Sequence, residues 1–186
     1  MTHPFLAKTA SGLAERGINT LRYQFPYMEK RQGRPDPPPV ARATVRAAVA
    51  EASRQFPGIP LFAGGKSFGG RMTSQAQADS VLPGVRGLVF LGFPLHPPGR
   101  TSEERAEHLS DVQIPMLFLQ GTRDEFADTA LLKQVVERLG RRAILHLFDD
   151  ADHSFHVPKR TGRTDLEIMT EALDATDEWV KQVLGL

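Results

Sequence analysis

Three side chains in this sequence have the types and the order that nucleophilic catalysis needs. The first, Ser67, lies in Gly65-Lys66-Ser67-Phe68-Gly69, directly after the apolar run 59–64. A strand that turns through G-x-S-x-G into a helix exposes the serine oxygen above the edge of a sheet. Glycines let the strand and the helix pass closely while the serine takes a strained backbone conformation. We therefore predict that Ser67 is a nucleophile and that the backbone N–H of Phe68 belongs to an oxyanion hole.

The second and third side chains are Asp124 and His153. Serine is a weak nucleophile at neutral pH, so it needs a base, usually histidine, and the base needs an acid to orient it. Asp124 follows the apolar stretch 115–121 and His153 follows the stretch 143–148. The order Ser, Asp, His is the one expected when each residue follows a strand of one parallel sheet. Asp124 is therefore the predicted acid and His153 the predicted base, with His156 as the alternative base.

The same residues allow other interpretations. Gly65-Lys66-Ser67 matches the end of a phosphate-binding loop, but Pro60 occupies the position where that motif needs its first glycine. A structural turn with an inert Ser67 is a second alternative. Several aspartates and histidines share the segment 149–156, yet their spacing fits no strong metal motif. We expect no metal and no cofactor.

Three further residues are candidates for a substrate pocket. Lys66 is expected to be exposed beside Ser67, where its charge could favour an acidic group of the substrate. Phe93 ends the apolar stretch 85–93 and His96 lies in the loop after it, so both could line the pocket next to the turn that carries Ser67. Plain packing of the loop is the alternative for His96.

The bulk composition limits the classes of partner. The chain has 186 residues, 40% apolar and 24% charged, which suits a single domain over 1–186. A net charge of +1 gives no electrostatic case for nucleic acid or an acidic membrane surface. The absence of cysteine excludes disulfides and thiol catalysis and suits a reducing cytoplasm, where we expect this protein. No apolar stretch approaches the ~20 residues of a membrane span, and there is no signal-peptide pattern. The expected partner is a small molecule, with the chain a monomer or a homodimer.

Helical and strand patterns alternate along the chain. Asp128 is expected to cap one helix, and Trp179 to pack the last helix on the sheet. Because the strands are apolar throughout, the alternation predicts an α/β fold with a mostly parallel sheet and helices on both faces. The expected helices are 4–16, 40–55, 69–79, 102–110, 128–139 and 165–184, and the expected strands are 18–25, 61–63, 85–93, 115–121 and 143–148.

These motifs resemble the α/β-hydrolase superfamily, and within it the small branch similar to dienelactone hydrolase. The most similar group contains testis-expressed protein 30 and the third regulatory subunit of the NSL histone-acetyltransferase complex. The resemblance covers nearly the whole chain and implies the same roles for Ser67, Phe68, Asp124 and His153. Its motifs are His3-Pro4-Phe5, the segments 21–27, 64–71 and 93–99, Leu119-Gln120-Gly121-Thr122-Arg123-Asp124 and Ala151-Asp152-His153-Ser154-Phe155.

The chain departs from this family at its beginning. Relatives carry a strand and a His-Gly-rich loop before the residues that match His3-Pro4-Phe5, and that loop supplies the second oxyanion donor. By resemblance, the missing strand would lie between the strands at 20–25 and 61–63. We therefore expect an α/β-hydrolase domain without its N-terminal strands and oxyanion loop, and hypothesise that the sequence starts too late. Loss of one oxyanion donor lowers turnover by ~10²–10³.

Together these expectations lead to a function and to an alternative. The first is a serine hydrolase that cleaves a small carboxylic ester, thioester or lactone through an acyl-enzyme. Acyl transfer by the same residues is a variant that the sequence does not separate from hydrolysis. The alternative is an interaction module that keeps the fold but has little or no catalytic activity.

Overall fold

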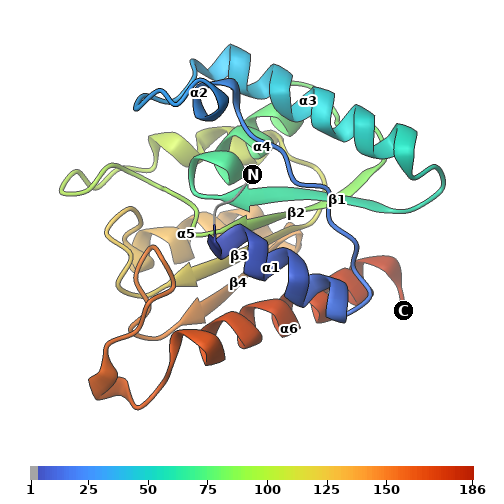
Figure 1. Ribbon diagram of the computed structural model, residues 1–186. Helices are drawn as coiled ribbons and strands as arrows, with labels where there is room; N and C mark the ends of the chain where they lie inside the picture. Colours follow the sequence, from blue (N-terminus) through green and yellow to red (C-terminus); the bar gives the residue numbers. More distant parts are fainter. Residues whose placement is uncertain (1–3) are drawn as a thin grey trace.

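The computed structural model describes residues 4–186. Its core is a sheet of parallel strands in the order β1-β2-β3-β4 (Figure 1). The strands are β1 (Leu61–Lys66), β2 (Val85–Leu91), β3 (Met116–Gly121) and β4 (Ala143–Phe148). The helices are α1 (Pro4–Glu15), α2 (Pro26–Glu29), α3 (Pro38–Gln55), α4 (Phe68–Asp79), α5 (Thr129–Leu139) and α6 (Asp165–Leu184), and the 3-10 helices are η1 (Glu104–Asp111), η2 (Gly140–Arg142) and η3 (Lys159–Thr161).

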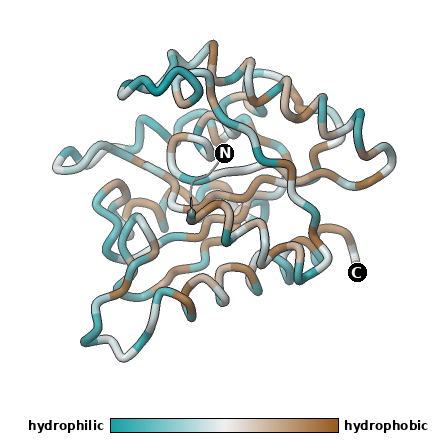
Figure 2. Tube along the Cα trace, viewed as in Figure 1, coloured by the Kyte–Doolittle hydropathy of each residue, from teal (hydrophilic) through white to brown (hydrophobic). Residues whose placement is uncertain are grey.

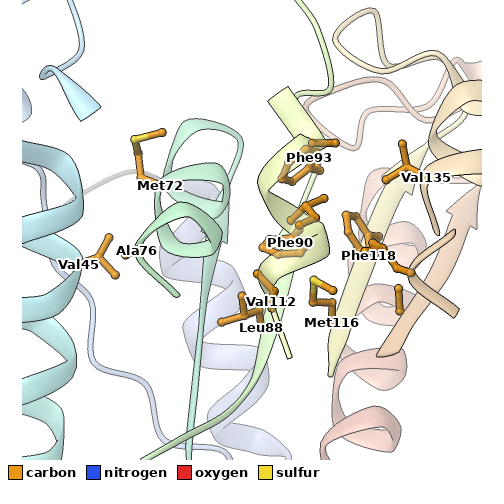
Figure 3. Packing of buried hydrophobic residues seen from close by; sticks show 14 of the residues in the cluster. Val45, Met72, Ala76, Leu88, Phe90, Phe93, Val112, Met116, Phe118 and Val135 are labelled. Carbon is orange, nitrogen blue, oxygen red and sulfur yellow. The ribbon is translucent and has the colours of Figure 1, made fainter. Parts of the chain in front are cut away.

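Helices cover both faces of the sheet. Sequential parallel strands joined by crossovers of one hand place every connecting helix on the same face. The connections α4, η1 and α5 lie on one face together with α3, where one hydrophobic cluster includes Val45, Met72, Phe90 and Phe118 (Figure 3). On the other face α1 packs beside α6, and a second cluster includes Leu117 and Ile168 (Figure 1).

Hydropathy follows this layered arrangement. The strands in Figure 2 are largely brown, while several connecting loops are teal. In β3 every residue is buried, as expected for a strand covered on both faces. None of the helices within residues 4–186 is long and apolar enough to cross a membrane.

The predicted cap and the predicted packing of the last helix are confirmed. The side chain of Asp128 accepts a hydrogen bond from the backbone N–H of Leu131 at 2.9 Å, so it caps α5. Trp179 of α6 is buried, and its ring lies edge-on to Phe62 of β1 with 5.4 Å between centroids. Gly87 of β2 is required there because a Cβ atom would lie 2.5 Å from the Trp179 ring.

The predicted strand 18–25 is wrong. This segment has no ladder hydrogen bonds and crosses from α1 to α2 without joining the sheet, so β1 is an edge strand within residues 4–186 (Figure 1). Its end packs through aromatic rings instead: Phe25 is buried, and its ring lies 5.6 Å from Tyr23 and 5.4 Å from Phe68. A strand needs a neighbouring strand for its backbone groups, but this segment forms backbone hydrogen bonds only at its ends, where Ile18 donates to Leu13 and Phe25 accepts from Met28.

Candidate active site

The register of the sheet brings the candidate residues to one edge. Lys66 pairs with Leu91 across β1 and β2, and Gly121 pairs with Phe148 across β3 and β4. The strands therefore end side by side, and the loops that carry Ser67, Asp124 and His153 leave from the same edge. In parallel sheets this edge is where ligands bind.

Ser67 occupies the turn between β1 and α4 in a strained conformation. Its backbone angles are φ 51° and ψ −119°, a region that residues other than glycine rarely adopt. The surroundings hold it there: the N–H of Ser67 donates to the carbonyl of Leu91 at 3.1 Å, and its own carbonyl accepts from Arg71 at 3.1 Å. Backbone strain maintained at one serine is the feature expected of a nucleophile elbow.

Two glycines make this turn possible. A Cβ atom on Gly70 would lie 2.7 Å from the carbonyl oxygen of Gly65, and one on Gly65 would lie 3.1 Å from the nitrogen of Gly70. Gly69 is less constrained, since its nearest neighbour would be a Phe25 ring atom at 3.7 Å. The close approach of strand and helix therefore depends on Gly65 and Gly70 rather than on Gly65 and Gly69.

The structure brings Asp124 and His153 together. Nδ1 of His153 lies 2.6 Å from Oδ2 of Asp124, whose side chain has an exposed fraction of 0%. With Nδ1 protonated and donating to this buried carboxylate, Nε2 of His153 carries the lone pair that accepts a proton. The ring of Phe126 lies 4.5 Å from the His153 ring and limits its movement. The pair has the geometry of an oriented base.

The carboxylate of Asp124 is held by groups that the sequence analysis did not select. Gln120 in β3 donates from Nε2 to Oδ2 of Asp124 at 2.5 Å and accepts from the N–H of Phe93 at 2.8 Å. The N–H of Phe126 donates to Oδ1 of Asp124 at 2.8 Å. A signal for Gln120 was present, because it is a polar residue within an otherwise apolar strand.

Gly92 connects the elbow with the His–Asp pair. It directly follows Leu91, whose carbonyl binds the N–H of Ser67, and it has a φ of +71°. A Cβ atom at this position would lie 3.3 Å from Nδ1 of His153 and 3.5 Å from Oδ2 of Asp124. Glycine therefore leaves the space that the pair occupies beside the end of β2.

Lys66 is not exposed as expected. Its side chain is half-buried, its Nζ donates to the backbone carbonyl of His153 at 2.5 Å, and it lies 4.7 Å from the centre of the Phe5 ring and 5.3 Å from that of Phe155. Burial lowers the pKa of Lys66 to about 8, although the negative charge of Asp124 opposes this shift. The ammonium group therefore fastens the loop that carries His153 instead of facing an open pocket.

Phe93 and His96, the other predicted pocket residues, have structural contacts. Phe93 is 1% exposed and packs against the rings of Phe90 and Phe118 in the core. His96 is buried, its Nε2 accepts from the N–H of Asp128 at 2.8 Å, and its Nδ1 donates to the carbonyl of Pro97 at 2.9 Å. Because both ring nitrogens are occupied, His96 positions the loop at the start of α5 and is not free to bind substrate.

The alternative base, His156, has a different partner. Its Nδ1 lies 2.9 Å from a carboxylate oxygen of Asp165 at the start of α6, and both side chains are exposed. Hydrogen bonding to Asp165 is the main cause that raises the pKa of His156. The geometry therefore favours His153 over His156 as the partner of Asp124.

Comparison with known proteins identifies the family. The sequence pattern of the alpha/beta hydrolase domain family matches residues 1–181, so the chain belongs to this family. The fold is also that of solved serine hydrolases and esterases. An alpha-beta serine hydrolase homologue from Coxiella burnetii is 22% identical, with a TM-score of 0.73 over 94% of this chain and 77% of the other.

Two other solved structures have the same fold. A lidless alpha/beta serine hydrolase from Xanthomonas campestris is 25% identical, with a TM-score of 0.73 over 96% of this chain and 75% of the other. The esterase domain of a Rhodothermus marinus protein is 14% identical, with a TM-score of 0.70 over 96% of this chain and 80% of the other. These similarities support a hydrolase-type fold and leave the substrate to be argued from the site.

Proposed function

We propose that this protein is a serine hydrolase that cleaves a small carboxylic ester, thioester or lactone. The observation that carries the proposal is the hydrogen bond between His153 and the fully buried Asp124, beside a turn that holds Ser67 at φ 51°. Neither feature is needed to stabilise a fold. Backbone strain and a buried, oriented His–Asp pair are both typical of catalytic sites.

Each residue has a role in the proposed reaction. His153 accepts the hydroxyl proton of Ser67 at Nε2 while Oγ forms a bond to the carbonyl carbon of the substrate. Asp124 stabilises the imidazolium that results. His153 then donates the proton to the leaving group, which departs and leaves an acyl-enzyme. Water, deprotonated by His153, attacks this ester and releases the acid and Ser67.

The oxyanion of each tetrahedral intermediate would be stabilised at the N-terminus of α4. Phe68 is the first residue of this helix, so its N–H has no partner within the helix and lies next to the nucleophile. The positive end of the helix dipole favours the negative charge that develops there.

We also propose the finer relationship that the sequence motifs favour, with the branch similar to dienelactone hydrolase and the group of testis-expressed protein 30. Motifs throughout the chain support it, among them Gly64–Arg71, which forms the elbow. A small substrate fits this proposal, because the connections between the strands are short and contain no separate lid domain.

Hydrolysis of p-nitrophenyl acetate tests the proposal. Ser67→Ala is expected to abolish release of p-nitrophenol above the background of buffer. Ser11→Ala, at an exposed position of α1, is the matched control and should leave the rate unchanged. Equal rates for Ser67→Ala and the unmodified protein would contradict the proposal and favour the interaction module.

A further inference from the structure

A cluster of positive charge lies on α4 and η1, one helical turn after the nucleophile. Arg71 of α4 has a buried Nε atom without a hydrogen-bond partner in residues 4–186. Side chains in an α-helix tilt toward its N-terminus, which here is the end that carries Ser67. Consistent with this direction, the guanidinium carbon of Arg71 lies 5.9 Å from the centre of the Phe68 ring.

The groups around Arg71 do not neutralise its charge. Burial is the main cause that lowers the pKa of Arg71, and the positive charge of Arg105 on η1 lowers it further. Within the described part of the chain, neither arginine forms an ion pair with an aspartate or a glutamate. Charged groups that are removed from water are normally paired, so two half-buried arginines on adjacent elements without an ion-pair partner are an unusual arrangement.

A neighbouring histidine, His108, adds no charge to this arrangement at pH 7. His108 of η1 lies with Nε2 2.8 Å from Oγ of Ser74 on α4. Burial, assisted by the charge of Arg71, lowers its pKa to about 4, so His108 is neutral at pH 7. The acids on the two elements, Asp79 of α4 and Glu104, Glu107 and Asp111 of η1, form no ion pair with Arg71 or Arg105 in residues 4–186, and Asp79 pairs with Arg42 instead.

We propose that Arg71, assisted by Arg105, binds a carboxylate of the substrate, so that the ester attacked by Ser67 belongs to a molecule with a free carboxylate. The proposal rests on the proposed function and names its substrate class. A guanidinium group binds a carboxylate with two parallel hydrogen bonds. Four residues of helix rise by ~6 Å, which suits a carboxylate separated by a few carbon atoms from the ester carbonyl.

Two esters with the same leaving group test this preference. The p-nitrophenyl monoester of succinic acid carries the carboxylate, and p-nitrophenyl butyrate replaces it with an apolar end of similar length. The unmodified protein is expected to have a kcat/KM at least about tenfold higher for the succinate ester. Arg71→Gln should reduce this ratio about tenfold or more, which is the contribution expected of a charged hydrogen bond. Arg105→Gln should reduce it less.

Arg54→Gln is the matched control for these variants. Arg54 pairs with Glu51 on the exposed surface of α3, so its replacement should leave the ratio of the two esters unchanged. A ratio in Arg71→Gln that equals that of Arg54→Gln would overturn the proposal.

Binding without turnover separates this inference from the proposed function. In Ser67→Ala, succinate should bind near Arg71 and raise the pKa of His108, because the bound anion offsets the charge of Arg71. The ring resonances of His108 in an NMR pH titration report this shift. A shift of His108 in Ser67→Ala, combined with no ester turnover by the unmodified protein, would support the anion site and contradict the hydrolase. An unshifted His108 in 10 mM succinate, or a shift with phosphate alone, would overturn the carboxylate site.

Discussion

The substitution Gly92→Ala tests whether the geometry of the His–Asp pair controls the reactivity of Ser67. Gly92 has a φ of +71°, and its Cβ atom would lie 3.3 Å from Nδ1 of His153. At this distance the ring of His153 must move by a few tenths of an ångström. Since a displacement of about 1 Å at a catalytic group costs roughly 10²-fold in rate, we expect labelling by a fluorophosphonate to slow by about tenfold.

Gly99→Ala is the control that separates this displacement from backbone strain. Gly99 has a nearly identical φ of +72°, but a Cβ atom there would meet nothing within 4 Å. Both variants should lose about 1–2 kcal/mol of stability, because alanine is strained in the left-handed region. For a domain of this size that corresponds to a melting temperature lower by about 2–8 °C.

The assay therefore compares two quantities in both variants: the melting temperature from circular dichroism and the rate of phosphonylation. Gly92→Ala and Gly99→Ala should lose similar stability, while only Gly92→Ala should react slowly. Equal labelling rates in the two variants would refute the reasoning, because the position of His153 would then not limit the reaction.

Two further predictions concern Lys66 and His108. Lys66→Met keeps an unbranched side chain between the aromatic rings but removes the hydrogen bond to the carbonyl of His153, so labelling should slow by about 2–10-fold. Lys133→Met, at an exposed position of α5, is the control and should leave the labelling rate unchanged. Equal labelling rates for the two variants would contradict a role for Lys66 in holding the loop. The stability of the protein should fall as the pH decreases from 6.5 to about 4, by up to roughly 3 kcal/mol, because in this range the unfolded chain protonates His108 and the folded one does not. Urea unfolding at several pH values should show a shallower dependence for His108→Gln, and an unchanged dependence would show that His108 is not responsible. The charges that act on His108 are Arg71, Asp79, Asp111 and Arg42.

Much of the fold follows from local patterns in the sequence. The apolar strands and amphipathic helices have a strong periodicity, and most of their predicted ranges agree with the structure to within a few residues. The segment 18–25 shows the limit of such patterns. Its composition suits a strand, but strand formation depends on a neighbouring backbone that no local pattern describes.

In the candidate site, too, some features could be predicted from the sequence and others could not. Ser67, Asp124 and His153 could be chosen because chain order and strand ends are visible in a sequence. The contacts of Lys66 and His96 could not be predicted, because both depend on backbone groups from distant segments. Lys66 donates to the carbonyl of His153, and His96 accepts from the N–H of Asp128. The missing counter-charge of Arg71 becomes visible only when every neighbour is known.

Mass spectrometry of the protein after reaction with a fluorophosphonate tests the central claim most directly. We predict a single covalent adduct, located on the peptide that contains Ser67 and absent from Ser67→Ala. A folded protein that forms no adduct, or forms it on another residue, would contradict the assignment of Ser67 as the nucleophile.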